Sequence, residues 1–216
     1  MNQISDLKII VIGPEYTGKT SFVNMWTKNI FSANYKATVV SEFGFKIFDL
    51  KGRKFRVQLW DIGGQDKTCA MAKIFAKDSH GCLVVSDINN ANSIQRSLQW
   101  KNTVDDVAKF MDGKDLPCVL IENKTDLYEG NIMDVERTAK RFAKENGYVD
   151  VFLTSVKKKE NVDESMECLI ANIVERMDRF MKSGGNASYE RESIKLNNEK
   201  KSKNVKKRND GDEGCC

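Results

Sequence analysis

Apolar residues along this chain gather in short runs that alternate with stretches of helical periodicity. The runs are rich in β-branched and aromatic residues, as in strands buried on both faces. They lie at Leu7–Gly13, Phe43–Leu50, Lys54–Asp61, Gly81–Ile88, Pro117–Asn123 and Asp150–Ser155. Apolar residues at three- and four-residue steps predict helices at about 19–29, 67–78, 92–112, 132–146 and 162–181.

This alternation of strands and helices determines the expected fold class. It predicts an α/β fold, with six strands in a mostly parallel sheet and about five helices on its two faces. The short link at 51–53, Lys-Gly-Arg, predicts a hairpin between the second and third strands, which adds one antiparallel edge strand. Ligands in such folds bind at the carboxyl ends of the strands.

The hydrophobic pattern stops near residue 181. We expect one domain over residues 1–181 and a flexible tail over 182–216, because the tail is polar, charged and punctuated by glycine. The alternative for the tail is a further short helix at about Tyr189–Asn197. The tail carries 9 basic and 6 acidic residues, whereas the domain carries 26 and 25, so we expect no nucleic-acid partner.

Composition also argues against two classes of protein, those that span a membrane and those that carry a secretory signal. No apolar run approaches the roughly 18–20 residues of a membrane span. The first residues, Met-Asn-Gln-Ile-Ser-Asp-Leu-Lys, are not typical of a secretory signal, so we expect reduced cysteines. Cys69, Cys82, Cys118 and Cys168 have no metal-ligand spacing and are expected to be core residues.

The first chemical motif follows the first predicted strand. Gly13, four residues, Gly18, Lys19 and Thr20 match the phosphate-binding loop and lie between a strand and a helix. Backbone N–H groups and the helix dipole favour an anion there, so we expect a P-loop NTPase fold. Lys19 would neutralise the β- and γ-phosphates, and the Thr20 hydroxyl would ligate Mg²⁺. The alternative is a turn bounded by two glycines.

A second motif, Trp-Asp-Ile-Gly-Gly-Gln-Asp at 60–66, ends the third predicted strand. Asp61 is placed to hold Mg²⁺ through water. Gly64 can bring its N–H close to a γ-phosphate, because it has no Cβ in the way. Gln65 can orient an attacking water and is the predicted catalytic residue. Taken alone, the motif is also compatible with an ordinary turn.

The third motif concerns the base. In Asn123-Lys124-Thr125-Asp126, the carboxylate can accept from N1–H and the exocyclic amine of guanine, a donor pair that adenine lacks. Lys124 can lay its aliphatic stem on the ring. In the loop that follows the last strand, up to Lys157, the Val156 N–H would donate to guanine O6 while Ser155 braces Asp126. The alternative is a solvated loop.

These motifs, in this order, resemble the small GTPases of the Ras superfamily over about residues 6–181. The resemblance implies binding and hydrolysis of GTP to GDP with Mg²⁺. It implies that Phe31 stacks on the base, that Thr38 ligates Mg²⁺, and that switch segments span about 31–43 and 63–78. It also implies phosphate contacts from the backbone amides of Tyr16, Thr17, Gly18, Lys19, Thr20 and Ser21.

Within that superfamily the chain looks like a Rab, the branch of vesicle-trafficking switches. The segments VQLWDIGGQ, GCLVVSDINN and SIQRSLQW are similar to Rab sequence, and FSANYKAT with KENGYVDVFLTS is similar to the branch linked to lysosome-related organelles and mitochondria. Phe43, Trp60 and Phe75 fall where Rabs present an aromatic trio to effectors, although simple core packing is also compatible. Expected partners are effectors, an exchange factor, a GTPase-activating protein, and prenylation and membrane-extraction chaperones.

The terminal Cys215 and Cys216 resemble the double geranylgeranylation signal of Rabs. Two lipid chains anchor stably where one is marginal, and the basic segment Lys200–Arg208 adds attraction to anionic lipid. The resemblance implies a location on the cytosolic face of an intracellular membrane, with a cytosolic pool. The alternative is a disordered tail with idle cysteines.

Several residues depart from the Rab pattern. Val40 replaces a glycine of switch I, and Pro14, Glu15 and Tyr16 fill the phosphate loop. Pro14 precedes the donor amides and Tyr16 acts through its backbone, whereas Glu15 places a carboxylate near a polyanion. We therefore expect normal binding and slow hydrolysis. The alternative is a constitutive binding module without useful turnover; an ATP-dependent enzyme is disfavoured by Asp126.

Overall fold

The computed structural model describes residues 4–34, 38, 40–65 and 69–184. The chain divides into two units, residues 1–176 and 177–216. The first unit holds all the strands and the predicted nucleotide motifs. The described part of the second unit is the end of a helix and the two residues after it. Cys215 and Cys216 lie outside the described residues, and the predicted boundary at 181/182 stays a prediction.

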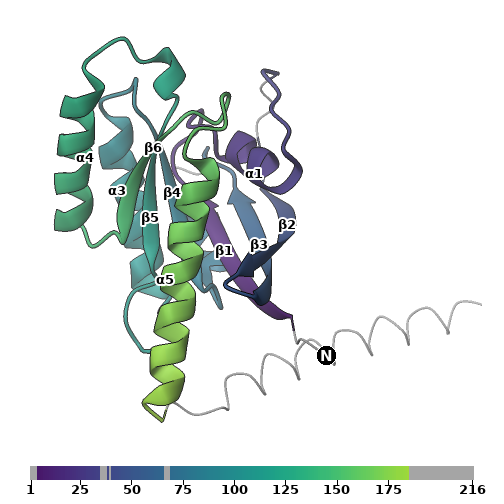
Figure 1. The fold of residues 1–216 in the computed structure, drawn as a ribbon. Coiled ribbons are helices and arrows are strands. Elements are labelled where there is room, and N and C mark those ends of the chain that lie inside the picture. Colours follow the sequence, from purple (N-terminus) through teal and green to yellow (C-terminus); the bar gives the residue numbers. More distant parts are fainter. Residues whose placement is uncertain (1–3, 35–37, 39, 66–68, 185–216) are drawn as a thin grey trace, which may run out of the picture. The chain divides into compact units, whose positions relative to one another are not determined.

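A six-stranded sheet forms the centre of the first unit (Figure 1). Its strands are β1 (Ser5–Ile12), β2 (Ser41–Leu50), β3 (Arg53–Ile62), β4 (Gly81–Asp87), β5 (Cys118–Asn123) and β6 (Asp150–Thr154). Their order is β2-β3-β1-β4-β5-β6, and only the β2–β3 pair is antiparallel. Lys51 and Gly52 make the hairpin turn, both with positive φ, 52° and 81°. The predicted sheet is confirmed.

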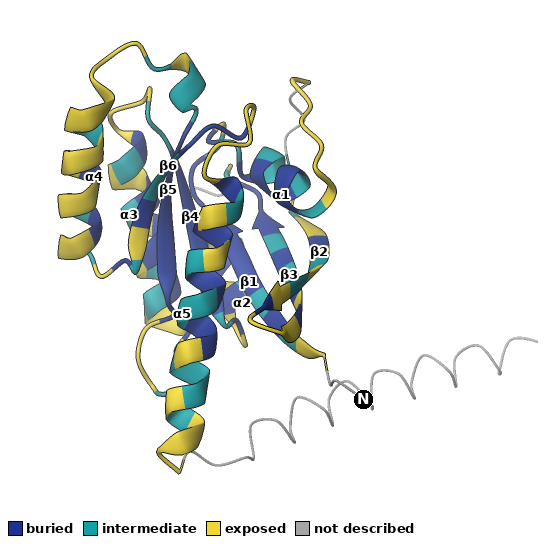
Figure 2. Cartoon of the chain, in the orientation of Figure 1, coloured by how far each residue is buried: buried dark blue, intermediate teal, exposed yellow. Residues whose placement is uncertain are grey.

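Five α-helices and one 3₁₀ turn connect the described strands. They are α1 (Lys19–Lys28), α2 (Ala70–Ala76), α3 (Ser93–Val107), η1 (Thr125–Leu127), α4 (Ile132–Glu145) and α5 (Val162–Lys182). Figure 1 shows α1 and α5 on one face of the sheet and α3 and α4 on the other, and α2, labelled in Figure 2, packs beside α3. None of the helices among the described residues is both long and apolar enough to cross a membrane.

Two predicted helices were too long. The third was expected to reach residue 112, but α3 ends at Val107 because Ala108 turns to extended backbone. The chain then pairs Lys109 with Asp115 and buries Phe110. The second was expected over 67–78, of which 66–68 lie outside the described residues. It ends at Ala76, because Lys77 is extended with φ −57° and ψ 136°.

The core lies where the central strands meet the helices (Figure 2). Strands β4 and β5 are buried along nearly their whole length, as their continuous apolar runs predict. The stripe of α5 that begins at Val162 and Met166 is buried against the sheet. A Cβ on Gly81 would lie 2.6 Å from Ile173, so the helix packs directly on the backbone of β4. Cys69, Cys82 and Cys118 are free thiols in the core, as expected, whereas Cys168 on α5 is only partly buried, so its assignment to the core was wrong.

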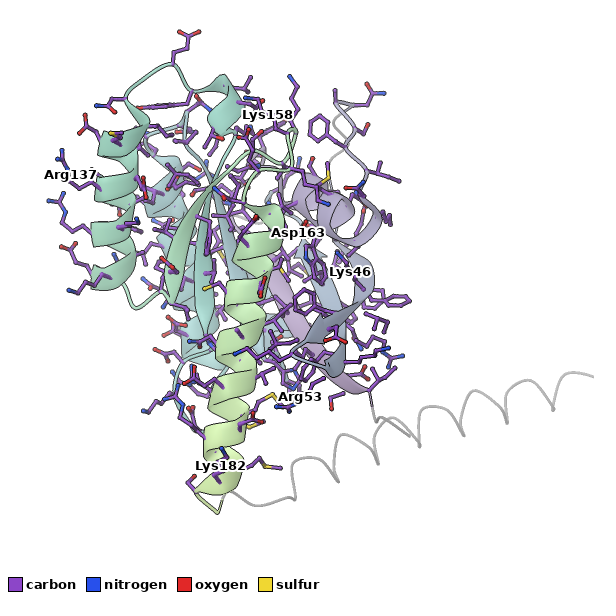
Figure 3. The ribbon with its side chains drawn as sticks, in the orientation of Figure 1. Lys46, Arg53, Arg137, Lys158, Asp163 and Lys182 are labelled. Carbon is purple, nitrogen blue, oxygen red and sulfur yellow. The ribbon has the colours of Figure 1, made fainter. Side chains whose placement is uncertain are left out.

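At the surface, Lys46 of β2 connects three elements. Its ammonium lies 3.8 Å from the carboxylate of Asp163 on α5 and 4.9 Å from the centre of the Trp26 ring on α1 (Figure 3). An exposed ion pair of this kind contributes less than about 1 kcal/mol. The fold is therefore held by the buried apolar layers, and its surface charges add little.

Candidate nucleotide-binding site

A cavity of about 790 Å³ opens at the carboxyl edge of the sheet. The predicted residues that line it are Tyr16, Gly18, Lys19, Thr20, Ser21, Phe31, Thr38, Gly64, Gln65, Asn123, Lys124, Asp126, Val156 and Lys157. Thr17, Asp61 and Ser155 are buried behind this lining. The structure therefore brings together in one place all the residues that the motifs assigned to a nucleotide and that it describes.

The loop between β1 and α1 has the backbone that its glycines permit. Gly13 and Gly18 have φ of 136° and 95°, a region that L side chains rarely adopt. A Cβ on Gly13 would lie 2.1 Å from the carbonyl oxygen of Val85, and one on Gly18 would lie 2.4 Å from the Asn123 amide. Tyr16 is also in the left-handed region, with φ 63°, and its side chain is 57% exposed. The large side chain therefore leaves the interior of the loop clear.

Lys19 is held inside this loop. Its ammonium donates to the carbonyl of Pro14 at 2.8 Å, and the Thr17 hydroxyl donates to the same oxygen at 3.0 Å. Burial lowers the pKa of Lys19 to about 8, although the charges of Asp61 and Glu15 act in the opposite direction. A buried cation that gains from added negative charge is suited to phosphate.

Three oxygen-bearing side chains meet beside Lys19. The Thr20 hydroxyl donates to Oδ2 of Asp61 at 2.5 Å and lies 2.8 Å from the hydroxyl of Thr38. Asp61 is fully buried, and its other oxygen, Oδ1, has no hydrogen-bond partner among the described residues. Burial raises the pKa of Asp61 to about 6, opposed by the hydrogen bond from Thr20.

These residues fit a divalent cation. Hard cations such as Mg²⁺ prefer oxygen donors and are held by one or two carboxylates or hydroxyls together with substrate phosphates. Thr20 and Thr38 offer hydroxyl ligands, and the unpartnered Oδ1 of Asp61 would accept from metal-bound water. A bound cation would supply positive charge that offsets the phosphates and the buried carboxylate.

The two glycines after β3 pack against the phosphate loop and switch I. A Cβ on Gly64 would lie 2.5 Å from both the backbone nitrogen of Glu15 and the ammonium of Lys19. Gly63 donates its N–H to the carbonyl of Val40 at 3.0 Å, and a Cβ there would lie 2.5 Å from the carbonyl oxygen of Thr38. Only glycine fits at either position, so both switch segments lie in backbone contact with the phosphate end of the cavity.

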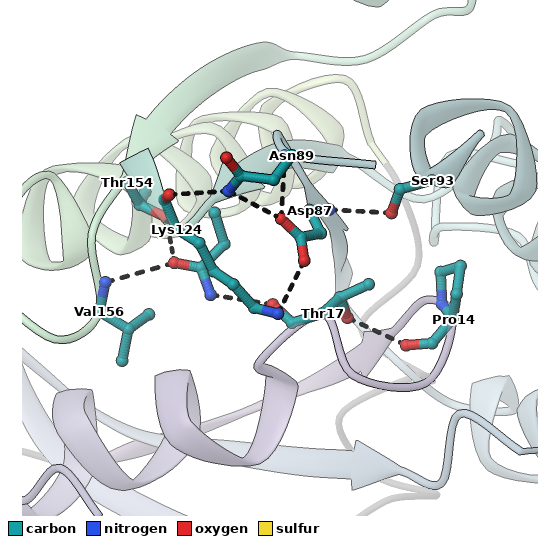
Figure 4. A network of polar contacts seen from close by, with 9 residues as sticks. Pro14, Thr17, Asp87, Asn89, Ser93, Lys124, Thr154 and Val156 are labelled. Atoms are coloured by element: carbon teal, nitrogen blue, oxygen red, sulfur yellow. Dashed lines mark hydrogen bonds and ion pairs between the residues drawn. The ribbon is translucent and has the colours of Figure 1, made fainter. Parts of the chain in front are cut away.

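At the other end of the cavity, Asn123 of β5 contacts the phosphate loop, the end of β6 and the loop after it, through partners that Figure 4 labels. Its amide donates to the carbonyl of Thr17 at 2.9 Å, and its oxygen accepts from the Thr154 hydroxyl at 3.1 Å and the Val156 N–H at 3.2 Å. The residue is buried, so these bonds form in a low-dielectric setting that strengthens them. Asn123 therefore links the phosphate loop to the end of β6 and to the loop that follows it.

The carboxylate of Asp126, to which the sequence analysis assigned base recognition, is oriented by a hydroxyl. Ser155 donates to Oδ1 of Asp126 at 2.6 Å, the contact that the sequence analysis assigned to it. The N–H of Val156, which was assigned to the base, donates instead to Asn123. That assignment now requires the N–H to be shared or to change partner when a base enters, and it stays a prediction.

The aromatic trio forms a continuous cluster that joins β2, β3 and α2, with Phe43 edge-on to Trp60 and Trp60 tilted against Phe75. The ring centres of Phe43 and Trp60 are 5.2 Å apart, and those of Trp60 and Phe75 are 5.6 Å apart. Phe43 is 51% exposed, so this cluster is not simply core. The effector-facing role assigned to the three residues stays a prediction.

Sequence reasoning missed two residues next to this site. Asp87 at the end of β4 pairs with Lys124 at 2.7 Å, and Asn89 donates to the Lys124 carbonyl at 3.1 Å. Both belong to the segment SDINN, which was used only for its resemblance to Rabs. An acidic residue at the carboxyl end of a buried parallel strand was the available signal, because such ends share one edge of the sheet.

Comparison with known proteins agrees with this geometry. The sequence model of the Ras family matches residues 8–175. Ras-related protein Rab-7L1 of Rattus norvegicus is 32% identical over 184 residues, which covers 84% of this chain and 89% of that protein. Ras-related protein Rab-32 of Sus scrofa is 32% identical over 194 residues, 88% of this chain and 85% of that protein. With these matches added to the phosphate loop, the oxygen cluster and the base-binding loops, the chain belongs to the Rab small GTPases of the Ras family and is related to the branch of Rab-7L1 and Rab-32.

Proposed function

We propose that this chain is a guanine-nucleotide switch that binds GTP and GDP with Mg²⁺, hydrolyses GTP slowly and recruits effectors to a membrane in vesicle trafficking. The observation that carries the proposal is the cavity itself. One end holds Lys19 and the cluster of Thr20, Thr38 and Asp61, and the other holds Asp126 braced by Ser155. A phosphate chain with a cation at one end and a guanine at the other matches this order of groups.

In hydrolysis the protein's part is to position groups and offset charge. Lys19 would neutralise the phosphates, Thr20 and Thr38 would hold the cation, and Gly64, which packs against Glu15 and Lys19, would offer its N–H to the γ-phosphate. Gln65 lines the same end of the cavity and is the proposed positioner of the attacking water.

The slow rate is proposed from Glu15. This residue lines the cavity, its backbone nitrogen lies next to Gly64, and its charge acts on Lys19. A carboxylate in that place opposes the negative charge that the phosphates carry and takes space that an arginine from an activating protein would use.

Single-turnover hydrolysis of GTP by the purified full chain tests this proposal, after the nucleotide that co-purifies with it has been identified. Glu15→Gly removes the side chain, and Glu15→Gln keeps its size while removing its charge. We expect about tenfold faster cleavage for Glu15→Gly and an intermediate rate for Glu15→Gln, the equivalent of about 1.4 kcal/mol in the barrier. Equal rates in all three, with and without an activating protein, would refute the role of Glu15. A chain that retains GTP without cleaving it would be a constitutive binding module.

The membrane anchor is proposed from the terminal Cys215 and Cys216. Two prenyl chains give stable attachment, and loss of one leaves a marginal anchor. A tagged full chain should be found on membranes, and a Cys215→Ser/Cys216→Ser chain should be found in the soluble fraction. Unchanged fractionation of the double variant would contradict the anchor while leaving the switch intact.

A further inference from the structure

Asp87, at the end of β4, and Asn89, in the loop after it, make hydrogen bonds that play no part in the proposed binding of nucleotide (Figure 4). Asp87 accepts from the ammonium of Lys124 through Oδ2 at 2.7 Å. Its other oxygen accepts from the backbone N–H of Asn89 at 3.0 Å and from the Asn89 side chain at 3.2 Å. The backbone of Asp87 is fixed in turn, because its N–H donates to the Ser93 hydroxyl at 2.8 Å.

Asn89 reaches the same lysine from a second direction. Its amide donates to the backbone carbonyl of Lys124 at 3.1 Å. Lys124 has φ 70°, a left-handed conformation that strains a residue with a side chain and persists only when neighbours hold it. This conformation begins the turn that carries Asp126. Asn89 therefore holds the backbone of Lys124, and Asp87 holds its side-chain end.

Neither Asp87 nor Asn89 lines the cavity, whereas Lys124 does. A free lysine stem must give up about 2 kcal/mol of rotamer entropy to lie along a ring. Its backbone carbonyl and its ammonium are both bonded, so the stem of Lys124 is held between two fixed ends where the residue lines the cavity. Without Asp87, the ammonium would be left to compete for Asp126, which lines the same space.

We propose that Asp87 and Asn89 form a positioning bracket that holds Lys124 over the guanine base and so sets how long nucleotide is retained. The bracket rests on the proposed function. Neither residue touches the nucleotide, and both act through Lys124. The bracket sets how long the nucleotide stays bound, whereas Asp126 selects the base.

Release of fluorescent GDP from the full, Mg²⁺-loaded chain into excess GDP tests the bracket. Removing the charge in Asp87→Asn should speed release about tenfold, as expected for a partly buried charge-assisted hydrogen bond. The matched control is Asp134→Asn, which removes a carboxylate paired with Arg137 at 2.8 Å on exposed α4, outside the cavity. The control should release at the wild-type rate.

Two further comparisons separate positioning from general damage. In a Lys124→Met background, Asp87→Asn should lose most of its effect, because the ion pair with the ammonium is gone and only the contact through Asn89 to the backbone of residue 124 is left. Inosine diphosphate lacks the exocyclic amine that Asp126 reads, so Asp87→Asn should speed release of GDP and of inosine diphosphate by the same factor. A changed ratio would mean that the Asp126 turn had moved, and this result would overturn action through Lys124.

Asn89→Ala gives an independent test should Asp87→Asn fold poorly, with about threefold faster release expected from one lost neutral hydrogen bond. Release at the control rate in both Asp87→Asn and Asn89→Ala would overturn the bracket alone. A wild-type chain that retains no GDP would overturn the proposed function and the bracket with it.

Discussion

Glu122 is a buried carboxyl group in β5, directly before the base-binding segment, and is 4% exposed. Successive strand residues face opposite sides, so Glu122 points away from the cavity that Asn123 faces. Its register neighbour on β4 is Ser86. Burial raises the pKa of Glu122 from 4.5 to about 7, assisted by the charge of Asp87 and opposed by the neighbouring Ser86 hydroxyl, which itself donates to the Ile121 carbonyl at 2.9 Å.

The sign of the effect on stability follows from this direction. A carboxyl whose pKa is higher in the folded chain stabilises the fold by taking up a proton. That contribution is complete below pH 4.5, the value for the unfolded chain, and is lost as pH rises through about 7. At about 1.4 kcal/mol for each pH unit between these values, the loss amounts to about 3 kcal/mol at pH 8.5.

Glu122→Gln replaces the carboxyl with a neutral group of the same shape and removes the titration. The variant should therefore be more stable than the wild type by about 1 kcal/mol at pH 5.5 and about 3 kcal/mol at pH 8.5. Urea unfolding followed by tryptophan fluorescence measures this, with both proteins saturated with GDP and Mg²⁺. Comparison at each pH cancels the nucleotide and the other titratable groups.

Glu129→Gln is the control, because Glu129 is exposed and should change stability by less than about 0.5 kcal/mol at either pH. The reasoning would be refuted if Glu122→Gln raised the free energy of unfolding by the same amount at the two pH values. A variant that is less stable than the wild type at pH 8.5 would refute it as well. Either result would mean that the folded chain holds the ionised carboxylate without a desolvation penalty.

Two other substitutions test the packing at the site and far from it. Gly64→Ala would place a Cβ 2.5 Å from the Glu15 nitrogen and the Lys19 ammonium, so we expect retained GDP binding and at least about tenfold slower single-turnover hydrolysis of GTP. Arg176→Met removes hydrogen bonds of 2.8 Å to both carboxylate oxygens of Asp112, and urea unfolding should show a loss of about 1–2 kcal/mol. An unchanged midpoint would show that this partly buried pair is fully screened.

The strands of this fold could be predicted because their burial has a direct signature in sequence. A parallel strand covered on both faces is continuously apolar, and β4 and β5 follow that rule. The end of α3 could not be predicted, since Val104, Ala108 and Met111 continue a helical period. The chain leaves the helix there to bury Phe110 under the guanidinium of Arg176, a contact across 66 residues that no local pattern reports.

The candidate site likewise has one part that the local sequence predicts and another that depends on contacts between distant segments. The phosphate loop could be predicted because its glycines and Lys19 act through local backbone geometry. The base end depends on contacts between strands that are distant in sequence, such as the Asn123 amide on the Thr17 carbonyl. The predicted donor Val156 bonds to Asn123 for that reason, and the link between Asp87 and Lys124 could be seen only once β4 and β5 lay side by side.

Burial also separates most of the departures from the Rab pattern from the residues that the motifs assign to phosphate and Mg²⁺; the exception is Pro14, which is buried. The phosphate and cation groups Lys19 and Asp61 are 6% and 0% exposed, so packing constrains them. The departures Tyr16 and Val40 are 57% and 46% exposed, and Val40 still accepts from the Gly63 N–H through its backbone. Glu15 lines the cavity from a half-buried position. The departures Glu15, Tyr16 and Val40 would, on the proposed function, change the charge and shape that γ-phosphate, activating proteins and effectors meet, while Lys19 of the phosphate loop and Asp61 of β3 stay buried. On the proposed function, this chain should differ from its relatives in how long it stays GTP-bound and which partners it meets, while its retention of guanine nucleotide should be ordinary.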